Sequence, residues 1–581
     1  MEMVKVTIDG REVQVPKNST ILAAARAAGI EVPTLCYNED LDVKGMCRVC
    51  VVEVEGSRTL QTACSQPVSD GMVVHTNSPR VRQARRVNVE LLLSNHPQDC
   101  LGCVRNQRCE LQTLADQLGI RELRFPRQVK SEQKDISTPA LVRDPSKCIL
   151  CRRCVEVCHQ VQGVGALYPV NRGFDTTIAP AGGVDLGDVA CVQCGQCSLV
   201  CPVGAIYEQD HTERVWAALA NPDKHVVVQT APAIRVSIGE EMGLEPGEVT
   251  TGQLVAALRR LGFDRVFDTD FSADLTIIEE GHELLKRLEN GETMPMITSC
   301  SPGWIKYIEH FYPDLLPHLS TCKSPQQMFG ALAKTYYAEK AGIDPANIYV
   351  VSIMPCTAKK FECGRPEMID SGYPDVDAVL TTRELGRMLR ENGIKFSELP
   401  EEEYDAPLGI STGAGVIFGA TGGVMEAALR TVYEVVTGET LPSLDFTAVR
   451  GLEGIKEAEV DLKGKKVKVA VTHGLGNARK LLDLIKAGKA DYQFIEIMCC
   501  PGGCIGGGGQ PIPTTKEIRQ KRIDAIYRAD AGMPLRKSHE NPAVQTLYKE
   551  FLGEPLGEKS HELLHTQYTK REKYPEKAAD M

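Results

Sequence analysis

The sequence is poor in aromatic residues, in positive charge and in long apolar runs. Aromatic residues make up 5% of its 581 residues and the net charge is -11, which excludes a general nucleic-acid binder, since phosphate contacts require a basic face. No apolar run is long enough to cross a bilayer, and the first residues, MEMVKVTIDGREVQVP, are charged and strand-like instead of forming a secretory signal. We therefore expect a multi-domain cytoplasmic protein without membrane contact.

Cysteine, in contrast, is abundant. The chain holds 22 cysteines, fifteen of them between Cys36 and Cys201, and C-x2-C spacings recur. Disulfides do not explain this number in a reducing compartment, so the pattern predicts several metal-thiolate sites.

Residues 1–78 alternate short apolar strands with one helix, in which Ser19 or Thr20 is expected to cap the first turn. This pattern predicts a small β-grasp domain. Four thiols around a loop and a returning strand suit a 2Fe-2S cluster, with a structural zinc ion as the alternative. The predicted ligands are Cys36, Cys47, Cys50 and Cys64.

The next segment, residues 79–122, is predicted to be helical and carries one histidine four residues before a C-x2-C-x5-C set. A lone histidine is usually a surface or core residue. Here three thiols are one ligand short of four, and a neutral imidazole can complete a 4Fe-4S site. The predicted ligands are His96, Cys100, Cys103 and Cys109.

Residues 138–212 contain two copies of the run C-x2-C-x2-C-x3-C, which is typical of bacterial ferredoxins with two clusters, after a polar linker at 125–140. In such pairs the fourth cysteine of each run ligates the cluster of the other run. The predicted 4Fe-4S sites are Cys148, Cys151, Cys154 and Cys201, and Cys191, Cys194, Cys197 and Cys158. Four clusters before residue 205 indicate that electrons are relayed between a remote surface of the protein and the site of its reaction.

From about residue 222 the sequence alternates apolar strands with amphipathic helices, which predicts an α/β core with largely parallel sheets. Thiols follow three of the predicted strands. They are Cys300, Cys356, and the group Cys499, Cys500 and Cys504. Since the carboxyl ends of such strands share one crevice, we predict a fifth metal cluster there, with glycines 506–509 allowing close backbone approach. Cys322 and Cys363 fit ordinary core thiols.

Charged residues lie beside two of these strands. Lys359 and Lys360 follow Cys356, and three glutamates are expected at the start of a helix: Glu279, Glu280 and Glu283. Their ordinary interpretation is surface charge. Near a buried anionic metal centre, a lysine can instead donate to the ligands and carboxylates can relay protons.

Three stretches, TSCSPGW (298–304), MPCTAKKFE (354–362) and EIMCCPGGCIGG (496–507), resemble the active-site signatures of the catalytic subunit of iron-only hydrogenases. The similarity is strongest to the subunit of multimeric NAD(P)-linked, electron-bifurcating enzymes. It covers essentially the whole chain, so that residues 222–581 resemble the catalytic domain with a C-terminal small-subunit-like segment. The resemblance implies an H-cluster, a 4Fe-4S cube bridged through one cysteine to a two-iron centre with CO, cyanide and azadithiolate.

By the same resemblance, Cys356, Cys500 and Cys504 are cube ligands, with Cys504 as the bridge, and Lys359 donates to a cyanide. The implied proton path consists of Glu280, Ser320 and Glu283. The residues implied around the two-iron centre are Pro232, Met354, Phe418 and Met498.

The first signature departs from the family, which has two cysteines where this chain has Cys300 and Ser301. In a gapless register the relay thiol falls on Cys300 and the cube ligand on Ser301. Because thiolate is the better iron ligand, we favour Cys300 as the fourth cube ligand, with Ser301 or a water in the relay. Cys499 stands where the family usually has a small residue, and its alternatives are a spare ligand, a redox-sensitive thiol and a packing residue.

The resemblance implies reversible conversion of protons and electrons to H2. The implied partners are a NAD(P)H- and flavin-binding iron-sulfur subunit and a small 2Fe-2S subunit, with ferredoxin as a further candidate. The stretch GLGNARK (474–480) has only a fragment of a dinucleotide-binding pattern. One rival is an electron-transfer subunit of a complex I-like or formate dehydrogenase assembly, which has no need of MPCTAKK. The other is a hydrogenase-like assembly factor, against which Lys359 and the proton-path carboxylates speak.

Overall fold

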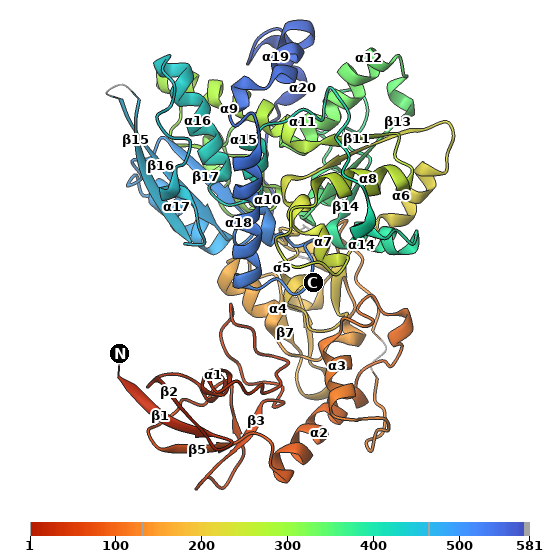
Figure 1. Ribbon diagram of the computed structural model, residues 1–581, viewed down its shortest axis with the longest axis vertical. Helices are drawn as coiled ribbons and strands as arrows, with labels where there is room; N and C mark the ends of the chain where they lie inside the picture. The colour runs from red at the N-terminus through yellow and green to blue at the C-terminus, as the bar shows by residue number, and fades with distance from the viewer. Residues whose placement is uncertain (1, 130–131, 463–464, 575–581) are drawn as a thin grey trace.

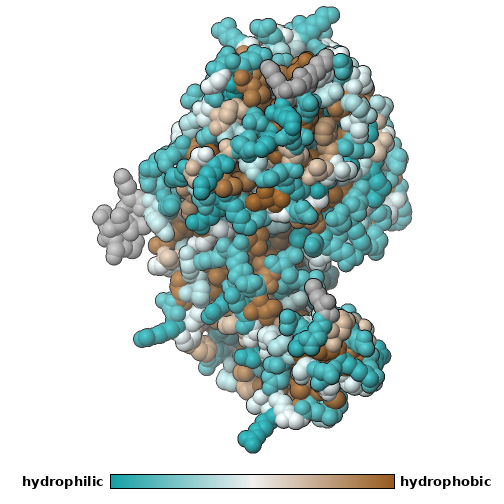
Figure 2. Space-filling view, turned by 90° about the vertical axis from the view of Figure 1, so that its left-hand side faces the viewer, coloured by the Kyte–Doolittle hydropathy of each residue, from teal (hydrophilic) through white to brown (hydrophobic). Residues whose placement is uncertain are grey.

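The computed structural model describes residues 2–129, 132–462 and 465–574 of an elongated, two-lobed molecule. The N-terminal modules form a smaller lobe at one end, and the α/β part forms the larger lobe at the other (Figure 1). On the face shown in Figure 2 the surface is mostly hydrophilic, with scattered apolar patches. None of the helices in the described ranges is both long and apolar enough to cross a membrane.

The first module is a five-stranded sheet of order β2-β1-β5-β3-β4. Its inward side chains alternate along the strands, so that Val4, Val6 and Ile8 are buried. Thr20 caps the single helix by accepting the Ala23 N–H at 3.2 Å, as predicted for this position. The elements are β1 (Met3–Ile8), β2 (Arg11–Pro16), α1 (Ile21–Ala27), β3 (Val51–Val54), β4 (Gln61–Thr62) and β5 (Met72–His75).

The second module is helical, as predicted. Helix α2 (Pro79–Ser94) begins after Ser78, whose side chain accepts the Val81 N–H, and α3 (Glu110–Gln117) begins directly after Cys109. A short 3-10 turn, η1 (Cys100–Gly102), lies between them. Of the predicted linker at 125–140, residues 130 and 131 lie outside the described ranges.

The third module has two small antiparallel sheets. In one, β6 (Leu141–Arg143) pairs with β9 (Ile206–Glu208), which brings the beginning and end of the module together. In the other, β7 (Tyr168–Val170) pairs with β8 (Thr177–Ala179). Each cysteine run contains a short helix, α4 (Arg153–Glu156) in the first run and α5 (Gln196–Val200) in the second.

The larger lobe contains two four-stranded sheets. The first has the order β11-β10-β13-β14 and is entirely parallel, and the second has the order β12-β17-β16-β15, with only β15 antiparallel. The prediction of largely parallel sheets is therefore confirmed. The strands are β10 (His225–Thr230), β11 (Arg265–Asp268), β12 (Met296–Ile297), β13 (Ile348–Met354), β14 (Ala378–Thr381), β15 (Ile455–Leu462), β16 (Lys465–His473) and β17 (Phe494–Met498).

Helix α9 (Thr269–Asn290) is longer than its sequence pattern indicates. It begins at Thr269 because the Asp268 side chain accepts the Asp270 N–H, and it runs for 22 residues, most of them buried. The three glutamates therefore lie in the interior of a helix, and their predicted place at a helix start was wrong. All three are buried as well, so surface charge does not explain them.

The C-terminal segment folds back on the main apolar core through Leu547, Leu552 and Leu564. The remaining helices cover the two sheets. They are α6 (Thr212–Leu219), α7 (Ile238–Glu241), α8 (Thr251–Leu261), α10 (Pro302–Phe311), α11 (Pro325–Leu332), α12 (Ala338–Ala341), α13 (Ala358–Glu362), α14 (Thr382–Glu391), α15 (Gly413–Val416), α16 (Gly423–Thr437), α17 (Leu475–Lys486), α18 (Lys516–Gly532), α19 (Pro542–Leu547) and α20 (Glu558–Leu564).

Candidate metal centre and its relays

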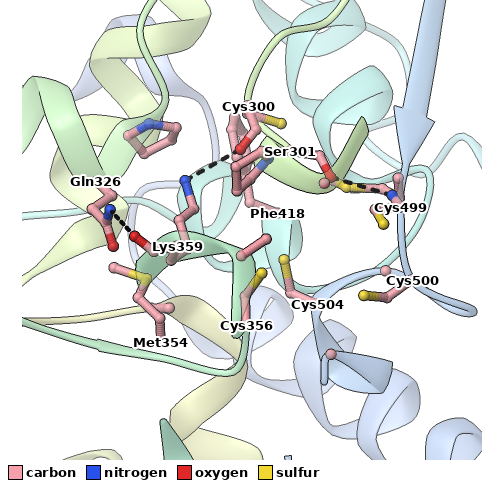
Figure 3. Close-up of a pocket in the computed structure, with 18 of the residues that line it drawn as sticks. Cys300, Ser301, Gln326, Met354, Cys356, Lys359, Phe418, Cys499, Cys500 and Cys504 are labelled. Atoms are coloured by element: carbon pink, nitrogen blue, oxygen red, sulfur yellow. Dashed lines mark hydrogen bonds between the residues drawn. The ribbon is translucent and has the colours of Figure 1, made fainter. Parts of the chain in front are cut away.

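One cavity in the larger lobe lies where the loops after β12, β13 and β17 meet. We call it the rear cavity. The first and last of these loops are about 200 residues apart in sequence, yet their thiols line the same space. This agrees with the prediction that thiols at the carboxyl ends of the strands share one crevice. The thiols and the hydroxyl that these loops contribute are Cys300, Ser301, Cys356, Cys499, Cys500 and Cys504 (Figure 3).

Glycines bring the walls of this cavity together. A Cβ at Gly507 would lie 2.1 Å from the Pro355 carbonyl oxygen, and one at Gly508 would lie 2.2 Å from the Cys194 carbonyl oxygen. Neither contact is sterically possible, so only glycine fits. The glycine-rich loop therefore packs directly on the Cys356 loop and on the third module.

The remaining wall is apolar. Met354 and Met498 are the last residues of β13 and β17 and are 3% exposed, while Phe418 is 5% exposed. Pro232 completes this wall just after β10. Together these side chains surround the cavity with hydrocarbon and sulfur and exclude water from it.

Lys359 is buried at the cavity and held by neighbours. Its ammonium donates to Glu362 Oε2 at 2.8 Å. It also donates to the Cys300 carbonyl oxygen at 3.3 Å, as Figure 3 shows. Gln326 donates to the same Glu362 oxygen at 3.1 Å. Sequence analysis did not single out Glu362 or Gln326; the i,i+3 spacing of Lys359 and Glu362 on one helix was the available signal for Glu362.

Lys360 has a different environment. Its ammonium is fully buried and pairs with Glu384 of α14 at 2.9 Å. Since it does not line the rear cavity, we assign it a structural role.

A row of polar side chains runs from the rear cavity along α9. Glu280 lies near the backbone N–H of Ser299, next to Cys300, and near the Ser320 hydroxyl, and both lower the pKa of its carboxyl. The Ser320 hydroxyl donates to Glu283 Oε2 at 2.8 Å. Burial, followed by the charge of Glu283, raises the pKa of Glu280 to about 8, so this carboxyl holds a proton at neutral pH.

The row continues to Arg287, which sequence analysis missed. Its guanidinium donates to Glu283 Oε1 at 2.6 Å and to the Leu319 carbonyl oxygen at 2.7 Å. The i,i+4 spacing of Glu283 and Arg287 on a helix was the signal for this pair.

Glu279 is adjacent to Glu280 but contacts the C-terminal segment instead of the row that leads to the rear cavity. It accepts from His565 at 3.1 Å and from the hydroxyls of Tyr548 and Ser560. Burial opposes its charge, yet the hydrogen bonds from His565, Ser560 and Tyr548 lower its pKa. Glu279 therefore anchors the C-terminal segment to α9.

The third module has two small cavities, each lined by four thiols. The two sets are the crossed sets predicted from the repeated run. One cavity is lined by Cys148, Cys151, Cys154 and Cys201, and the other by Cys158, Cys191, Cys194 and Cys197.

The backbone of both runs suits a bound cluster. Leu150 and Arg152 in the first run, and Gln193 and Gly195 at the matching positions of the second, have left-handed φ values between 56° and 71°. Such values are uncommon outside glycine, and alternating right- and left-handed residues turn successive N–H groups toward one anion, a geometry common at iron-sulfur sites.

Cys194 connects this module with the larger lobe, because it lines both its own cavity and the rear cavity. The GLGNARK stretch also packs here. Leu475 N–H donates to Gln162 at 3.0 Å, and a Cβ at Gly476 would lie 2.9 Å from the Val161 carbonyl oxygen. Its glycine serves domain packing.

The thiols of the first module form two pairs. The Cys47 N–H donates to Cys36 Sγ at 3.5 Å, and Cys50 Sγ donates to Cys64 Sγ at 3.3 Å. Two pairs of thiols match the two irons of a 2Fe-2S cluster, each of which takes two thiolates.

His96 in the second module is 8% exposed, and its Nδ1 has no hydrogen-bond partner. Burial, followed by the charge of Lys147, lowers the pKa of His96 to about 4. A buried neutral ring with an unpaired nitrogen suits a metal ligand. Of the cysteines beside it, Cys109 is buried, Cys103 is half-buried and Cys100 is exposed.

The comparisons with known proteins agree with this geometry. Residues 224–508 match the family "Iron only hydrogenase large subunit, C-terminal domain", and residues 516–571 match "Iron hydrogenase small subunit". The N-terminal modules match a 2Fe-2S iron-sulfur cluster binding domain at 1–79, an NADH-ubiquinone oxidoreductase-G iron-sulfur binding region at 85–124 and a 4Fe-4S dicluster domain at 147–205.

Two curated relatives match almost end to end. The chain is 55% identical to the NADP-reducing hydrogenase subunit HndD of Solidesulfovibrio fructosivorans, covering 99% of this chain and 100% of that protein. It is 42% identical to iron hydrogenase 1 of Clostridium pasteurianum, with coverage of 98% and 100%. A solved structure of an apo variant of HydA1 from Chlamydomonas reinhardtii has a TM-score of 0.57 and 50% identity, covering 62% of this chain and 99% of that one.

The chain thus belongs to the iron-only hydrogenase family. Within that family it is a hydrogenase catalytic subunit that carries 2Fe-2S and 4Fe-4S domains in front of the H-cluster fold.

Proposed function

We propose that the rear cavity holds the H-cluster through Cys356, Cys500 and Cys504, with Cys504 as the bridge to the two-iron unit. The observation that carries this proposal is the meeting of three distant thiol loops in one dry cavity. When bound, the cluster supplies the chemistry that interconverts two protons, two electrons and H2.

The side chains around the cavity position and shield the cluster. Lys359 donates to Glu362 and to the Cys300 carbonyl oxygen, which leaves one ammonium proton that would donate to a cyanide of the bound cluster. The apolar wall of Pro232, Met354, Phe418 and Met498 excludes water, which strengthens such a hydrogen bond and protects the metal.

Protons reach the cavity along α9. In the protonated state favoured by its raised pKa, Glu280 passes a proton toward Cys300 and is reloaded from Glu283 through the Ser320 hydroxyl. Arg287 holds the far oxygen of Glu283, so that the other oxygen stays on Ser320. Ser320 and Glu283 are already in hydrogen-bond contact at 2.8 Å.

Electrons travel through the smaller lobe. We propose one 2Fe-2S cluster in a β-grasp domain (1–78), one His-ligated 4Fe-4S cluster (79–122), two 4Fe-4S clusters (138–212) and the H-cluster domain (222–581). The chain of relays ends at Cys194, which touches both its own site and the rear cavity. The named activity of the relative HndD supports NADP as the electron carrier, delivered by partner subunits that bind NAD(P)H and flavin.

We further propose that the protein works in the cytoplasm as part of a hetero-oligomer with a flavin subunit and a small 2Fe-2S subunit, and that electron bifurcation brings in ferredoxin. An electron-transfer subunit without hydrogen chemistry is the alternative. It is disfavoured because relays alone have no need of a further thiol-lined cavity in the larger lobe with a carboxylate row ending at it.

The test is to co-express the full chain with the hydrogenase maturation machinery and to record infrared bands of CO and cyanide together with viologen-driven H2 release. Both signals are expected in the wild type, and both should vanish in Cys504→Ala. Absence of both in a wild type that retains its accessory-cluster signals would reject the catalytic assignment.

A further inference from the structure

Ser301 and Cys499 are neighbours in the rear cavity, and both sit where the family pattern is broken. The Ser301 hydroxyl oxygen accepts the backbone N–H of Cys499 at 3.2 Å (Figure 3). The residue that replaces a family cysteine therefore directly contacts the residue that adds one.

The Cys499 thiol is turned toward the other cavity thiols. It is 4% exposed and lines the rear cavity together with Cys500 and Cys194. A Cβ at Gly303 would lie 2.7 Å from Cys499 Sγ, so this glycine makes room for the thiol.

The Cys300 thiol faces another way. In Figure 3 its sulfur points away from those of Cys356 and Cys504. The ionisable groups around it are Glu280, Cys504, Lys359 and Glu496, and Glu280 also lies near the backbone N–H of the residue before it. This is the position of a proton relay at the end of the carboxylate row.

We propose that Cys499 supplies the fourth thiolate of the 4Fe-4S cube, in place of the cysteine that Ser301 replaces, and that Cys300 remains free as the relay thiol. This inference rests on the proposed function. It replaces the sequence-based preference for Cys300 as the fourth ligand. On binding, the Cys499 thiol releases its proton to solvent and the sulfur forms one bond to iron.

The chemistry of the two side chains favours this assignment over Ser301 as ligand. Iron in such clusters is held by thiolates, and a serine hydroxyl is a harder, far less acidic donor. The Ser301 oxygen is also occupied by the Cys499 N–H. Ser301 is thus a positioning residue that orients the loop carrying the new ligand.

The exchange also shortens the path for electrons. Cys499 contacts Cys194, which lines the nearest ferredoxin-type cavity. With Cys499 as a cube ligand, a ligand of the cube and a ligand of the nearest relay cluster are in direct contact.

The test uses the full chain expressed without the maturation machinery, so that iron content and electron paramagnetic resonance report the cube independently of H2 chemistry. Cys499→Ala should lose about four irons per chain and the signal of the rear cube, since a 4Fe-4S site needs its four ligands. Cys300→Ala and Ser301→Ala should keep both. The double variant Ser301→Cys with Cys499→Ala restores the family arrangement and should regain the cube.

The opposite pattern, with the cube lost in Cys300→Ala and kept in Cys499→Ala, would overturn the inference. Unchanged signals of the accessory clusters control for folding. Cys356→Ala and Cys504→Ala separate this inference from the proposed function. If they lose the cube while Cys499→Ala keeps it, only the ligand exchange fails; if they too keep all iron, the proposed H-cluster site fails.

Discussion

The two lobes gather thiols in different ways. In the third module each four-thiol cavity draws on two short cysteine runs whose backbone turns are set by neighbouring residues. In the rear cavity the thiols come from loops after β12, β13 and β17, which belong to two separate sheets. Relay sites are thus encoded locally, whereas the catalytic site exists only once the larger lobe is folded.

The lobes also differ in their exposure. Cys100 in the smaller lobe is exposed, while the wall residues Met354, Phe418 and Met498 of the rear cavity are nearly inaccessible. A relay must come within electron-transfer reach of partners at the surface, but hydrogen chemistry needs a dry site with separate routes for protons and electrons. Variants in each lobe can test this difference between the relay modules and the rear cavity.

The largest expected effect is the loss of the bridging thiol. Cys504→Ala should abolish H2 evolution with every electron donor, because the two-iron unit loses its link to the cube. The measurement is viologen-driven H2 release together with infrared spectra. The accessory-cluster signals should persist, and residual activity in this variant would contradict the role of Cys504.

The next effect is on proton delivery. Glu280→Gln should lower the H2 evolution rate by about 10² to 10⁴-fold, the usual contribution of a positioned proton-transfer group. CO and cyanide bands should remain, since no metal ligand is changed. The matched control is Glu279→Gln, which alters the neighbouring carboxyl without touching the row to the cavity; an equal rate loss in both would argue against a specific relay.

A variant of the smaller lobe should separate electron entry from chemistry. Cys50→Ala removes one of the paired thiols of the first module and should lower the rate supported by partner subunits by at least about tenfold, since the 2Fe-2S cluster is lost. Viologen-driven H2 release should fall much less. Equal losses in both assays would show that this cluster does more than connect the enzyme to its partners.

Stability should also differ between the lobes. Arg430 is fully buried and pairs with Glu426 at 2.7 Å and Asp530 at 2.9 Å, so Arg430→Met should destabilise the larger lobe by about 3 kcal/mol. The exposed pair of Arg121 and Asp116 is the control, and Arg121→Met should change little. Thermal unfolding followed by tryptophan fluorescence and cluster absorbance distinguishes the two lobes.

The smallest effect is the pH dependence. Glu280 has a pKa raised to about 8, so it is protonated below that pH and loses its proton as the pH rises through it. H2 evolution at saturating donor should therefore decline above about pH 8 in the wild type. In Glu280→Gln this decline should disappear from the residual rate; an unchanged profile would assign the decline to another group.

Much of this architecture could be predicted from the sequence because it follows from short-range patterns of residue spacing and hydrophobicity. The crossed cysteine sets follow from the repeated run, and the strands before Cys356 and Cys500 follow from continuous apolar stretches. The start of α9 was missed because its cap, Asp268, sits in a polar stretch that is buried only by tertiary packing.

The site residues Glu362 and Arg287 were missed for a related reason. Charged side chains in helices are normally exposed. Glu362 and Arg287 are recognised as partners of Lys359 and Glu283 only because the folded structure buries them beside those residues. Likewise, the positions of Ser301 and Cys499 are almost 200 residues apart, and nothing local indicates that a backbone N–H of one meets the hydroxyl of the other.

By itself, the sequence determined the thiol-rich stretches, the order of the modules and the strand ends at which the rear thiols lie, because spacing and apolar patterning act over a few residues. Only the tertiary structure decided which thiols face one another, which carboxyl keeps a proton and where Cys194 meets the rear cavity. Those properties depend on burial and on distances between groups remote in sequence, which exist only after the two sheets and the third module have packed together.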